Sequence, residues 1–282
     1  MNIADSLAAM PVTDVDLSRY VAVVRDATVA TTVGKMRAAH RACACVVDSG
    51  RVVGVFTQRD VLHRVIGRPG TWDRPITEEM TIRVRTMRST DSVWQGLAIM
   101  SDWWVRNVPV TDEETLVGNL SFYVVMTAMA DLLSARLGAA DEPELQHGLS
   151  FVDFTGLPTN PPVTVTTDET ADVAAHHMRA RGIGSVLVVD SRESLVGVLT
   201  EYDLLEKIGC DRSDLDQIEV GEIMTPDPVA LRVRSPIAGA IAEIAAHGFS
   251  HVPLLGETDR PVAVTSFRDI AQYVESSLEA LG

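Results

Sequence analysis

One seven-residue stretch, Gly-Val-Phe-Thr-Gln-Arg-Asp at residues 54–60, returns three more times along the chain with the same pattern. The other copies lie at residues 118–124, 197–203 and 263–269, and their Ser or Thr positions are 64, 79 and 66 residues apart. The copies therefore form two close pairs with a longer gap between them. Self-similarity of this kind marks a repeated structural unit, so it decides the fold before any other feature.

Each copy follows the same succession of predicted elements. An amphipathic helix, such as residues 29–39 or 170–181, precedes an apolar strand, a polar turn and a second apolar strand that ends at the repeated Ser or Thr. Another helix starts there, so the unit is β-α-β-β-α and the fold class is α+β. The first apolar strands are predicted at residues 42–47, 105–110, 185–189 and 251–255.

The length of 282 residues fits about two domains. A three-stranded sheet with helices on one face leaves its other face bare, so we expect two repeats packed sheet to sheet as one folding unit. Residues 141–150 are predicted to be a linker, because small, acidic and proline residues gather there. The first pair is expected in residues 1–140, with repeats at about 10–70 and 75–137, and the second in residues 151–282, with repeats at about 151–210 and 218–280.

Composition argues against several classes of protein. The net charge of −15 disfavours nucleic acid or an anionic membrane as the main partner, because binding to phosphate polymers requires a basic footprint. The longest apolar stretch, residues 122–133, is too short to cross a bilayer, and the first residues lack the pattern of a secretion signal. We therefore expect a cytoplasmic protein. Cys43, Cys45 and Cys210 have no C-x-x-C spacing and are interpreted as small core residues, with no metal site.

The repeated motif combines two chemical groups at the start of a helix. Its Ser or Thr can cap the helix, whose first N–H groups favour an anion. The Asp three residues later lies one turn in, where a carboxylate can accept hydrogen bonds from both hydroxyls of a ribose. The same pattern is also an ordinary capping box, which needs no ligand. Recurrence in register favours the ligand, and the second copy has Val124 in place of Asp, so a sugar contact is not expected there.

Taken together, the Gly-apolar-apolar-Thr-x-x-Asp motif, the Met-Thr pairs at residues 80–81 and 224–225 and the β-α-β-β-α unit resemble cystathionine-β-synthase (CBS) domains. The chain resembles four tandem CBS repeats, arranged as two pseudo-symmetric pairs called Bateman modules. The resemblance extends from about residue 12 to residue 278 and leaves no room for a separate catalytic domain. Members of this family bind AMP, ADP, ATP or S-adenosylmethionine, or bind nothing.

The resemblance implies roles for particular residues. The motif Asp corresponds to a ribose binder and the motif Ser or Thr to a phosphate or ribose contact, while a segment before each first helix lines the adenine pocket. Basic residues before the first long strand of the paired repeat, and in the motif itself, correspond to phosphate contacts. The implied ligand-binding residues are Val21, Thr57, Arg59, Asp60, Arg106, Val163, Thr200, Asp203, Val229, His251, Ser266, Arg268 and Asp269.

The resemblance implies a regulatory protein that binds adenine nucleotides between paired repeats, with magnesium accompanying ATP, and passes a conformational change to a regulated protein. A homodimer formed through the CBS pairs is also implied. Two alternatives stay open, an interaction protein with vestigial clefts and an S-adenosylmethionine sensor. An enzyme is not expected, since no nucleophile with its own base is visible. Trp94, Trp103 and Trp104 fit either core packing or a patch for self-association.

Overall fold

The computed structural model describes residues 3–68, 70–138, 153–156, 161–208, 214–266, 269–270 and 272–273. The predicted linker at residues 141–150 lies outside this part of the chain, as do Cys210 and Arg268. The side chains of residues 136–138 and 156 are likewise not described.

The first half of the chain contains two successive units with the same order of elements. After α1 (Ile3–Ala9) and the short turn η1 (Val12–Asp14), the first unit consists of β1 (Val21–Val24), α2 (Val29–Ala38), β2 (Cys43–Asp48), β3 (Arg51–Thr57), α3 (Gln58–Asp60) and the π-helical turn η2 (Val61–Val65). The second consists of α4 (Ile76–Glu79), β4 (Met87–Arg88), α5 (Val93–Trp103), β5 (Asn107–Asp112), β6 (Thr115–Ser121) and α6 (Phe122–Gly138).

The second half repeats this order. Its first unit contains η4 (Phe154–Gly156), β7 (Thr164–Thr166), α7 (Ala171–Arg181), β8 (Ser185–Val189), β9 (Leu195–Thr200), α8 (Glu201–Lys207) and η5 (Leu215–Gln217). Its second contains α9 (Val220–Ile223), β10 (Thr225–Pro226), β11 (Leu231–Arg232), α10 (Ile237–His247), β12 (His251–Leu255) and β13 (Pro261–Ser266). The α+β class is confirmed, and the predicted strands at residues 185–189 and 251–255 agree with β8 and β12.

Strand pairing is the same in all four units. The strand before each long helix pairs in parallel with the strand after it, as β1 does with β2 and β7 with β8. The next two strands form an antiparallel hairpin, and each hairpin changes register once, for example between Val46 and Val47 or between Val188 and Val189. This common irregularity bends every hairpin at the same point and so places the motif Ser or Thr alike in each unit.

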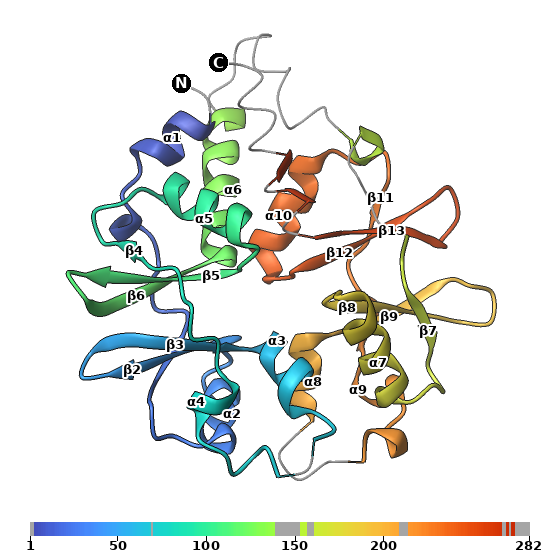
Figure 1. The fold of residues 1–282 in the computed structure, drawn as a ribbon. Coiled ribbons are helices and arrows are strands. Elements are labelled where there is room, and N and C mark those ends of the chain that lie inside the picture. The colour runs from blue at the N-terminus through green and yellow to red at the C-terminus, as the bar shows by residue number, and fades with distance from the viewer. Residues whose placement is uncertain are drawn as a thin grey trace.

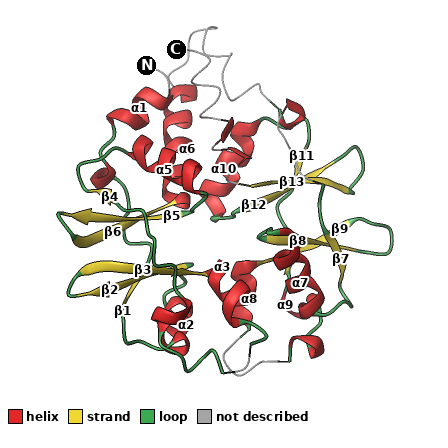
Figure 2. Cartoon of the chain, in the orientation of Figure 1, coloured by secondary structure: helices red, strands yellow, loops and turns green. Residues whose placement is uncertain are grey.

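The sheets lie in the middle of the molecule, and helices cover them on two sides (Figures 1 and 2). Helices α1, α5, α6 and α10 form one outer layer, and α2, α3, α7, α8 and α9 lie in the other. Burial of the apolar face of each helix against its sheet stabilises the layers.

The two large apolar clusters each join units from different halves of the chain. One cluster contains Val33 and Phe56 of the first unit together with Val186 and Leu204 of the third. The other packs the second unit against the fourth, through α6 and α10. The sequence predicted that consecutive repeats pack sheet to sheet and gave no sign of contacts between the pairs. In the structure the apolar cores also cross between the pairs, because the helix faces that leave the sheets meet each other.

The sheets of the first two units meet in a smaller contact. Arg51 of β3 pairs with Thr115 of β6, which joins their strands into one six-stranded sheet in the order β1-β2-β3-β6-β5-β4. Cys43 and Cys45 are buried between these sheets, as the sequence predicted. A hydrogen bond between the Cys43 thiol and Cys45, together with burial, raises the pKa of Cys43 well above its ordinary value. Within the described residues, none of the helices has the length and apolar character needed to span a bilayer.

Candidate functional site

The repeated Asp residues all fold back on the start of their own helix. The Asp60 Oδ2 atom accepts hydrogen bonds from the Thr57 backbone N–H at 2.8 Å and from its hydroxyl at 2.9 Å. The corresponding distances from Thr200 to Asp203 are 2.9 and 2.6 Å. Local capping therefore uses one oxygen of each carboxylate and leaves the other oxygen for a further partner.

The second oxygen has different partners in the two halves of the chain. Asp60 Oδ1 lies 3.5 Å from a guanidinium nitrogen of Arg64. Asp203 Oδ1 accepts from the Lys207 ammonium at 3.0 Å and from the Thr225 hydroxyl, also at 3.0 Å. The Oδ1 atom of Asp60 is therefore held less firmly than the Oδ1 atom of Asp203.

The fold changes the proton affinity of Asp60. Burial raises the pKa of Asp60 above its ordinary value of 3.8, while Arg64 and the hydrogen bonds from Thr57 act in the opposite direction. A partly desolvated carboxylate with an underused oxygen is a strong acceptor for a hydroxyl pair, because its charge is poorly compensated by water.

A central cavity of about 880 Å³ brings residues of all four units together. Its volume falls in the range of small-molecule sites. Eight of the residues singled out from the sequence line it, namely Thr57, Arg59, Asp60, Arg106, Thr200, Asp203, Val229 and His251.

The cavity lining reverses the sign of the chain's charge. Seven Arg or Lys residues line it against five Asp or Glu residues, whereas the whole chain carries a net charge of −15. The basic residues are Arg19, Arg41, Arg59, Arg83, Arg85, Arg106 and Lys207, and the acidic ones are Asp60, Glu201, Asp203, Glu206 and Asp227. A local basic excess of this kind attracts a small anion in an otherwise acidic protein.

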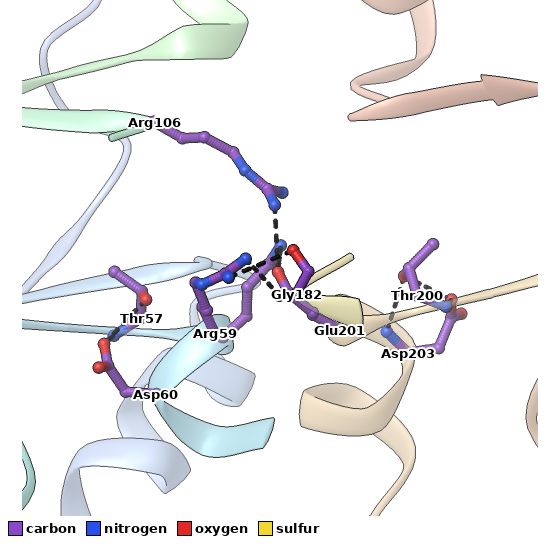
Figure 3. A network of polar contacts seen from close by, with 9 residues as sticks. Thr57, Arg59, Asp60, Arg106, Gly182, Thr200, Glu201 and Asp203 are labelled. Carbon is purple, nitrogen blue, oxygen red and sulfur yellow. Dashed lines mark hydrogen bonds and ion pairs between the residues drawn. The ribbon is translucent and has the colours of Figure 1, made fainter. Parts of the chain in front are cut away.

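Two of the arginines converge on one buried carboxylate, that of Glu201 (Figure 3). Its oxygens lie 3.2 Å from Arg106 Nη2 and 3.5 Å from Arg59 Nη1. Arg106 approaches it from the second unit, just before β5, and Arg59 approaches it from α3 of the first unit (Figure 3). The Gln58 side-chain amide is 3.4 Å from the same carboxylate, and Arg59 also donates to the carbonyl of Gly182 at 3.3 Å.

Gly184 allows Arg106 and His251 to approach the third unit closely. A Cβ atom on this residue would lie 2.7 Å from His251 Cε1 and 2.9 Å from Arg106 Nη2. The chain therefore has no side chain just before β8, at the point where Arg106 and His251 approach it. The predicted phosphate contacts Arg59, Arg106 and His251 consequently lie around one short segment, residues 182–184.

The remaining predicted residues are located elsewhere. Val21 and Val163 pack against the apolar cluster shared by the first and third units, outside the lining of the central cavity. Ser266 and Asp269 repeat the capping geometry, with the Ser266 N–H donating to Asp269 Oδ2 at 2.6 Å, and are also absent from that lining. Arg268 is outside the described residues. Val124 is buried in the cluster shared by the second and fourth units.

One segment of the second unit that lines the cavity was not predicted from the sequence. Thr81, Arg83, Val84 and Arg85 line the cavity there. The signal was available, because the Met-Thr pair at residues 80–81 aligns this segment with residues 225–229, which lead to Val229. Glu201 was also missed, since nothing local distinguishes it from any acidic residue in the first turn of a helix.

Of the two interpretations left open for the tryptophans, core packing fits Trp94 and does not fit Trp103 or Trp104. Trp94 packs on an apolar cluster, but Trp103 and Trp104 are 50% and 67% exposed and line the cavity. The guanidinium of Arg85 lies 3.9 Å from the centre of the Trp103 ring, in cation–π geometry. Trp104 ends α5 in the left-handed conformation, with φ at 59°. Gly182 and Gly248 occupy the corresponding positions after α7 and α10.

The chain belongs to the CBS domain family, since the CBS domain profile matches residues 12–67, 153–209 and 220–276, more than half of its length. These ranges correspond to the first, third and fourth units. Residues 68–152, which include the second unit, lie outside the matched ranges.

Comparison with a solved structure supports the arrangement of the whole chain. Protein MJ1225 of Methanocaldococcus jannaschii, described as a proposed archaeal homologue of γ-AMPK, superimposes with a TM-score of 0.76 at 17% identity. The match covers 94% of this chain and 100% of that one. At this identity the likeness concerns the fold.

Two curated relatives that match most of this chain are longer than it. The CBS domain-containing protein CBSCBSPB3 of Arabidopsis thaliana is 23% identical over 291 residues, which cover 93% of this chain and 52% of that protein. The meiotically up-regulated gene 70 protein of Schizosaccharomyces pombe is 22% identical, with coverage of 89% and 41%. The chain thus spans about half the length of these two relatives.

Proposed function

We propose that this protein is a regulatory sensor that binds AMP, ADP or ATP in its central cavity. The observation that carries the proposal is the convergence of two ribose-type carboxylates, Asp60 and Asp203, and three basic side chains on one cavity of about 880 Å³. Magnesium enters this proposal as the counter-ion of ATP.

Each part of a nucleotide has a matching group in the cavity. Asp60 or Asp203 would accept both ribose hydroxyls, since each carboxylate has one oxygen beyond the oxygen used in capping. Val84 and Val229 would flank adenine in the two halves. Arg59, Arg106 and His251 would meet phosphate, with the histidine contact strengthening as the pH falls.

The proposal includes four CBS repeats arranged as two pairs, with residues 75–137 as the second repeat. Its support is the shared order of elements, in which β4, α5, β5 and β6 correspond to β1, α2, β2 and β3. The second hairpin also has the same register change as the others, between Val110 and Thr111. The boundaries proposed for the pairs are residues 1–140 and 151–282.

Regulation in this scheme is a shift between arrangements of the two halves. A nucleotide that binds one arrangement more tightly than another raises the population of that arrangement. The change would be transmitted to a regulated protein, and a homodimer formed through the CBS pairs would be the assembly that responds.

Isothermal titration of the purified protein with AMP, ADP, ATP and S-adenosylmethionine tests this function. We expect saturable heat with at least one adenine nucleotide below millimolar concentration. No heat at millimolar ligand, with circular dichroism showing folded protein, would reject the sensor. Competition between ATP and S-adenosylmethionine identifies the preferred ligand class. A mass measurement on gently purified protein would identify any nucleotide that remains bound.

A second candidate is an interaction protein whose clefts are vestigial. The observation in its favour is that Asp60, Asp203 and Asp269 all accept a hydrogen bond from the backbone N–H of the Thr or Ser three residues earlier, as a capping carboxylate without any ligand does. Thermal unfolding with and without ATP separates the two candidates. A stabilisation by ATP that Asp60→Asn abolishes favours the sensor, and no stabilisation of the native protein favours the interaction protein.

A further inference from the structure

Glu201 is a buried charge whose partners come from the other half of the chain. Its side chain is 0% exposed, and Gln58, Arg59 and Arg106 of the first two units contact it. These partners lie 143, 142 and 95 positions away in the sequence. A carboxylate this deeply buried is stable only when its charge is compensated, so these contacts fix the two halves against each other at the centre of the molecule (Figure 3).

The residue is specific to one copy of the motif. It occupies the position directly after the motif Ser or Thr, where the other copies have Gln58, Phe122 and Phe267. The acidic side chain therefore does not belong to the capping geometry that the copies share. Its chemistry is explained by the arginines that it contacts, which are also the groups that a phosphate in this cavity would use.

The contact with Glu201 leaves part of Arg106 available. Its Nη2 atom contacts Glu201 at 3.2 Å, whereas its buried Nη1 atom has no hydrogen-bond partner among the described residues. Gly184 supplies the space in which this guanidinium lies. A guanidinium with one nitrogen bound to a carboxylate and another one free has the donor geometry to accept a second anion.

We infer that Glu201 is a specificity-determining residue that competes inside the protein with the phosphates of the ligand. Its carboxylate holds Arg59 and Arg106 in the free protein, and a ligand phosphate must share or replace that contact. Each further phosphate on the ligand adds repulsion from Glu201, so the residue lowers affinity for ATP more than for adenosine. Because the contact joins the two halves, phosphate binding also loosens their junction. This inference rests on the proposed function for its adenine ligands.

The test compares Glu201→Gln with Glu206→Gln by isothermal titration. Both variants remove one negative charge from the cavity lining, but Glu206 lies beside His40 and is not in contact with either arginine. The ligands are adenosine, AMP, ATP and inorganic tripolyphosphate. Tripolyphosphate probes the arginines without any adenosine contact.

For Glu201→Gln we expect ATP and tripolyphosphate to bind about tenfold more tightly than to the native protein, within the range measured for close charge pairs. Adenosine affinity should change less than about twofold, and Glu206→Gln should change ATP affinity less than about threefold, because its charge is farther away and screened. An equal gain for adenosine and ATP, or no gain for either phosphate ligand, would overturn the inference.

The outcomes separate this inference from the proposed function. If adenine ligands do not bind any variant but tripolyphosphate binds Glu201→Gln more tightly than Glu206→Gln, the nucleotide sensor is rejected and the role of Glu201 stands. If no ligand binds any folded variant, both are rejected. Should Glu201→Gln fail to fold, Glu201→Asp keeps the charge and withdraws it by one methylene group. It should then bind tripolyphosphate about threefold more tightly, since Coulomb attraction weakens with distance, and an unchanged affinity would contradict the inference.

Discussion

The two halves of the chain place the same Thr-x-x-Asp motif on the same cavity but hold its carboxylate differently. Four residues after each Asp comes a basic residue, Arg64 in the first half and Lys207 in the second. Arg64 donates to the backbone carbonyl of Glu79 and stands 3.5 Å from Asp60. Lys207 donates at 3.0 Å to Asp203 and also to the carbonyls of residues 223 and 224. In the second half Thr225 adds a further hydrogen bond to the carboxylate.

The difference shows that the motif does not by itself define a ligand site. Capping is encoded within four residues and is the same in both halves. Availability of the second carboxylate oxygen depends on groups outside the motif, namely Lys207 in the same helix and Thr225 in the neighbouring unit for Asp203. Asp60 retains an underused oxygen in a basic environment, so we expect the first half to bind ligand more tightly than the second.

The largest expected effect is on ligand affinity. Asp60→Asn should weaken binding of the tightest adenine nucleotide by about 10- to 100-fold, the loss of a charged hydrogen-bond acceptor. The matched variant Asp203→Asn should weaken it by less than about threefold, because Asp203 is already occupied by Lys207 and Thr225. Titration calorimetry measures both constants. Equal losses in the two variants would remove the distinction between the halves.

A methyl group at Gly184 should disturb the junction of the two halves. Gly184→Ala is expected to destabilise the protein by about 1 kcal/mol, because Arg106 and His251 must move aside to avoid overpacking. The Gly184→Ala protein should also bind ATP more weakly than the native protein. The matched variant Gly34→Ala, in α2 with no atom near the added methyl group, should instead stabilise by about 0.5–1 kcal/mol. Urea unfolding compares the two variants, and a Gly184→Ala protein as stable as Gly34→Ala would contradict the packing described.

Asp60 should also give the first half its own dependence on pH. Because burial raises the pKa of folded Asp60 above 3.8, the folded state retains this proton to higher pH than the unfolded state. Its contribution to the free energy of unfolding is therefore largest at low pH and declines as the pH rises through the raised value. Asp60→Asn should gain stability relative to the native protein between about pH 4 and pH 7, as measured by urea unfolding. A difference that does not vary with pH would show that Asp60 titrates normally.

The helix ends at the cavity offer a smaller contrast. Trp104 is left-handed where the fourth unit has Gly248, and this conformation costs about 1–2 kcal/mol for a residue with a side chain. Trp104→Gly should thus stabilise the protein by about 0.5 kcal/mol, after the greater flexibility of unfolded glycine is subtracted. Gly248→Ala should destabilise it. Thermal unfolding measures both, and a less stable Trp104→Gly protein would mean that contacts of the tryptophan outweigh the strain.

The smallest effect should come from releasing Asp203. Thr225→Val removes the hydroxyl that donates to its outer oxygen and keeps the shape of the side chain. We expect an affinity gain of about twofold to threefold at the second half, at the lower end of the range for one hydrogen bond. Titration to higher ligand concentration would detect it as a second binding step. Thr81→Val, at the aligned position in the second unit, should have no such effect.

Much of the fold could be predicted from the sequence because its signals are local. The four motif copies, the apolar strands and the Ser or Thr caps each depend on residues within a few positions of one another, as in the 3-residue separation of Thr200 and Asp203. Thr57 and Asp60 belong to this local motif, whereas Arg106 followed from the resemblance to CBS domains. The sequence left core packing and a self-association patch open for Trp103 and Trp104, because apolar character alone does not distinguish a core residue from one at a cavity.

The sequence by itself determined the family, the order of elements in each unit and the carboxylates that cap their helices. Only the tertiary structure decided that the cores cross between the pairs and that Glu201 meets Arg59 and Arg106 at the centre. The physical reason is the range of the interactions. Capping and strand periodicity are set by backbone geometry over a few residues, whereas a charge pair 142 positions apart in the chain exists only once the helices and sheets have packed.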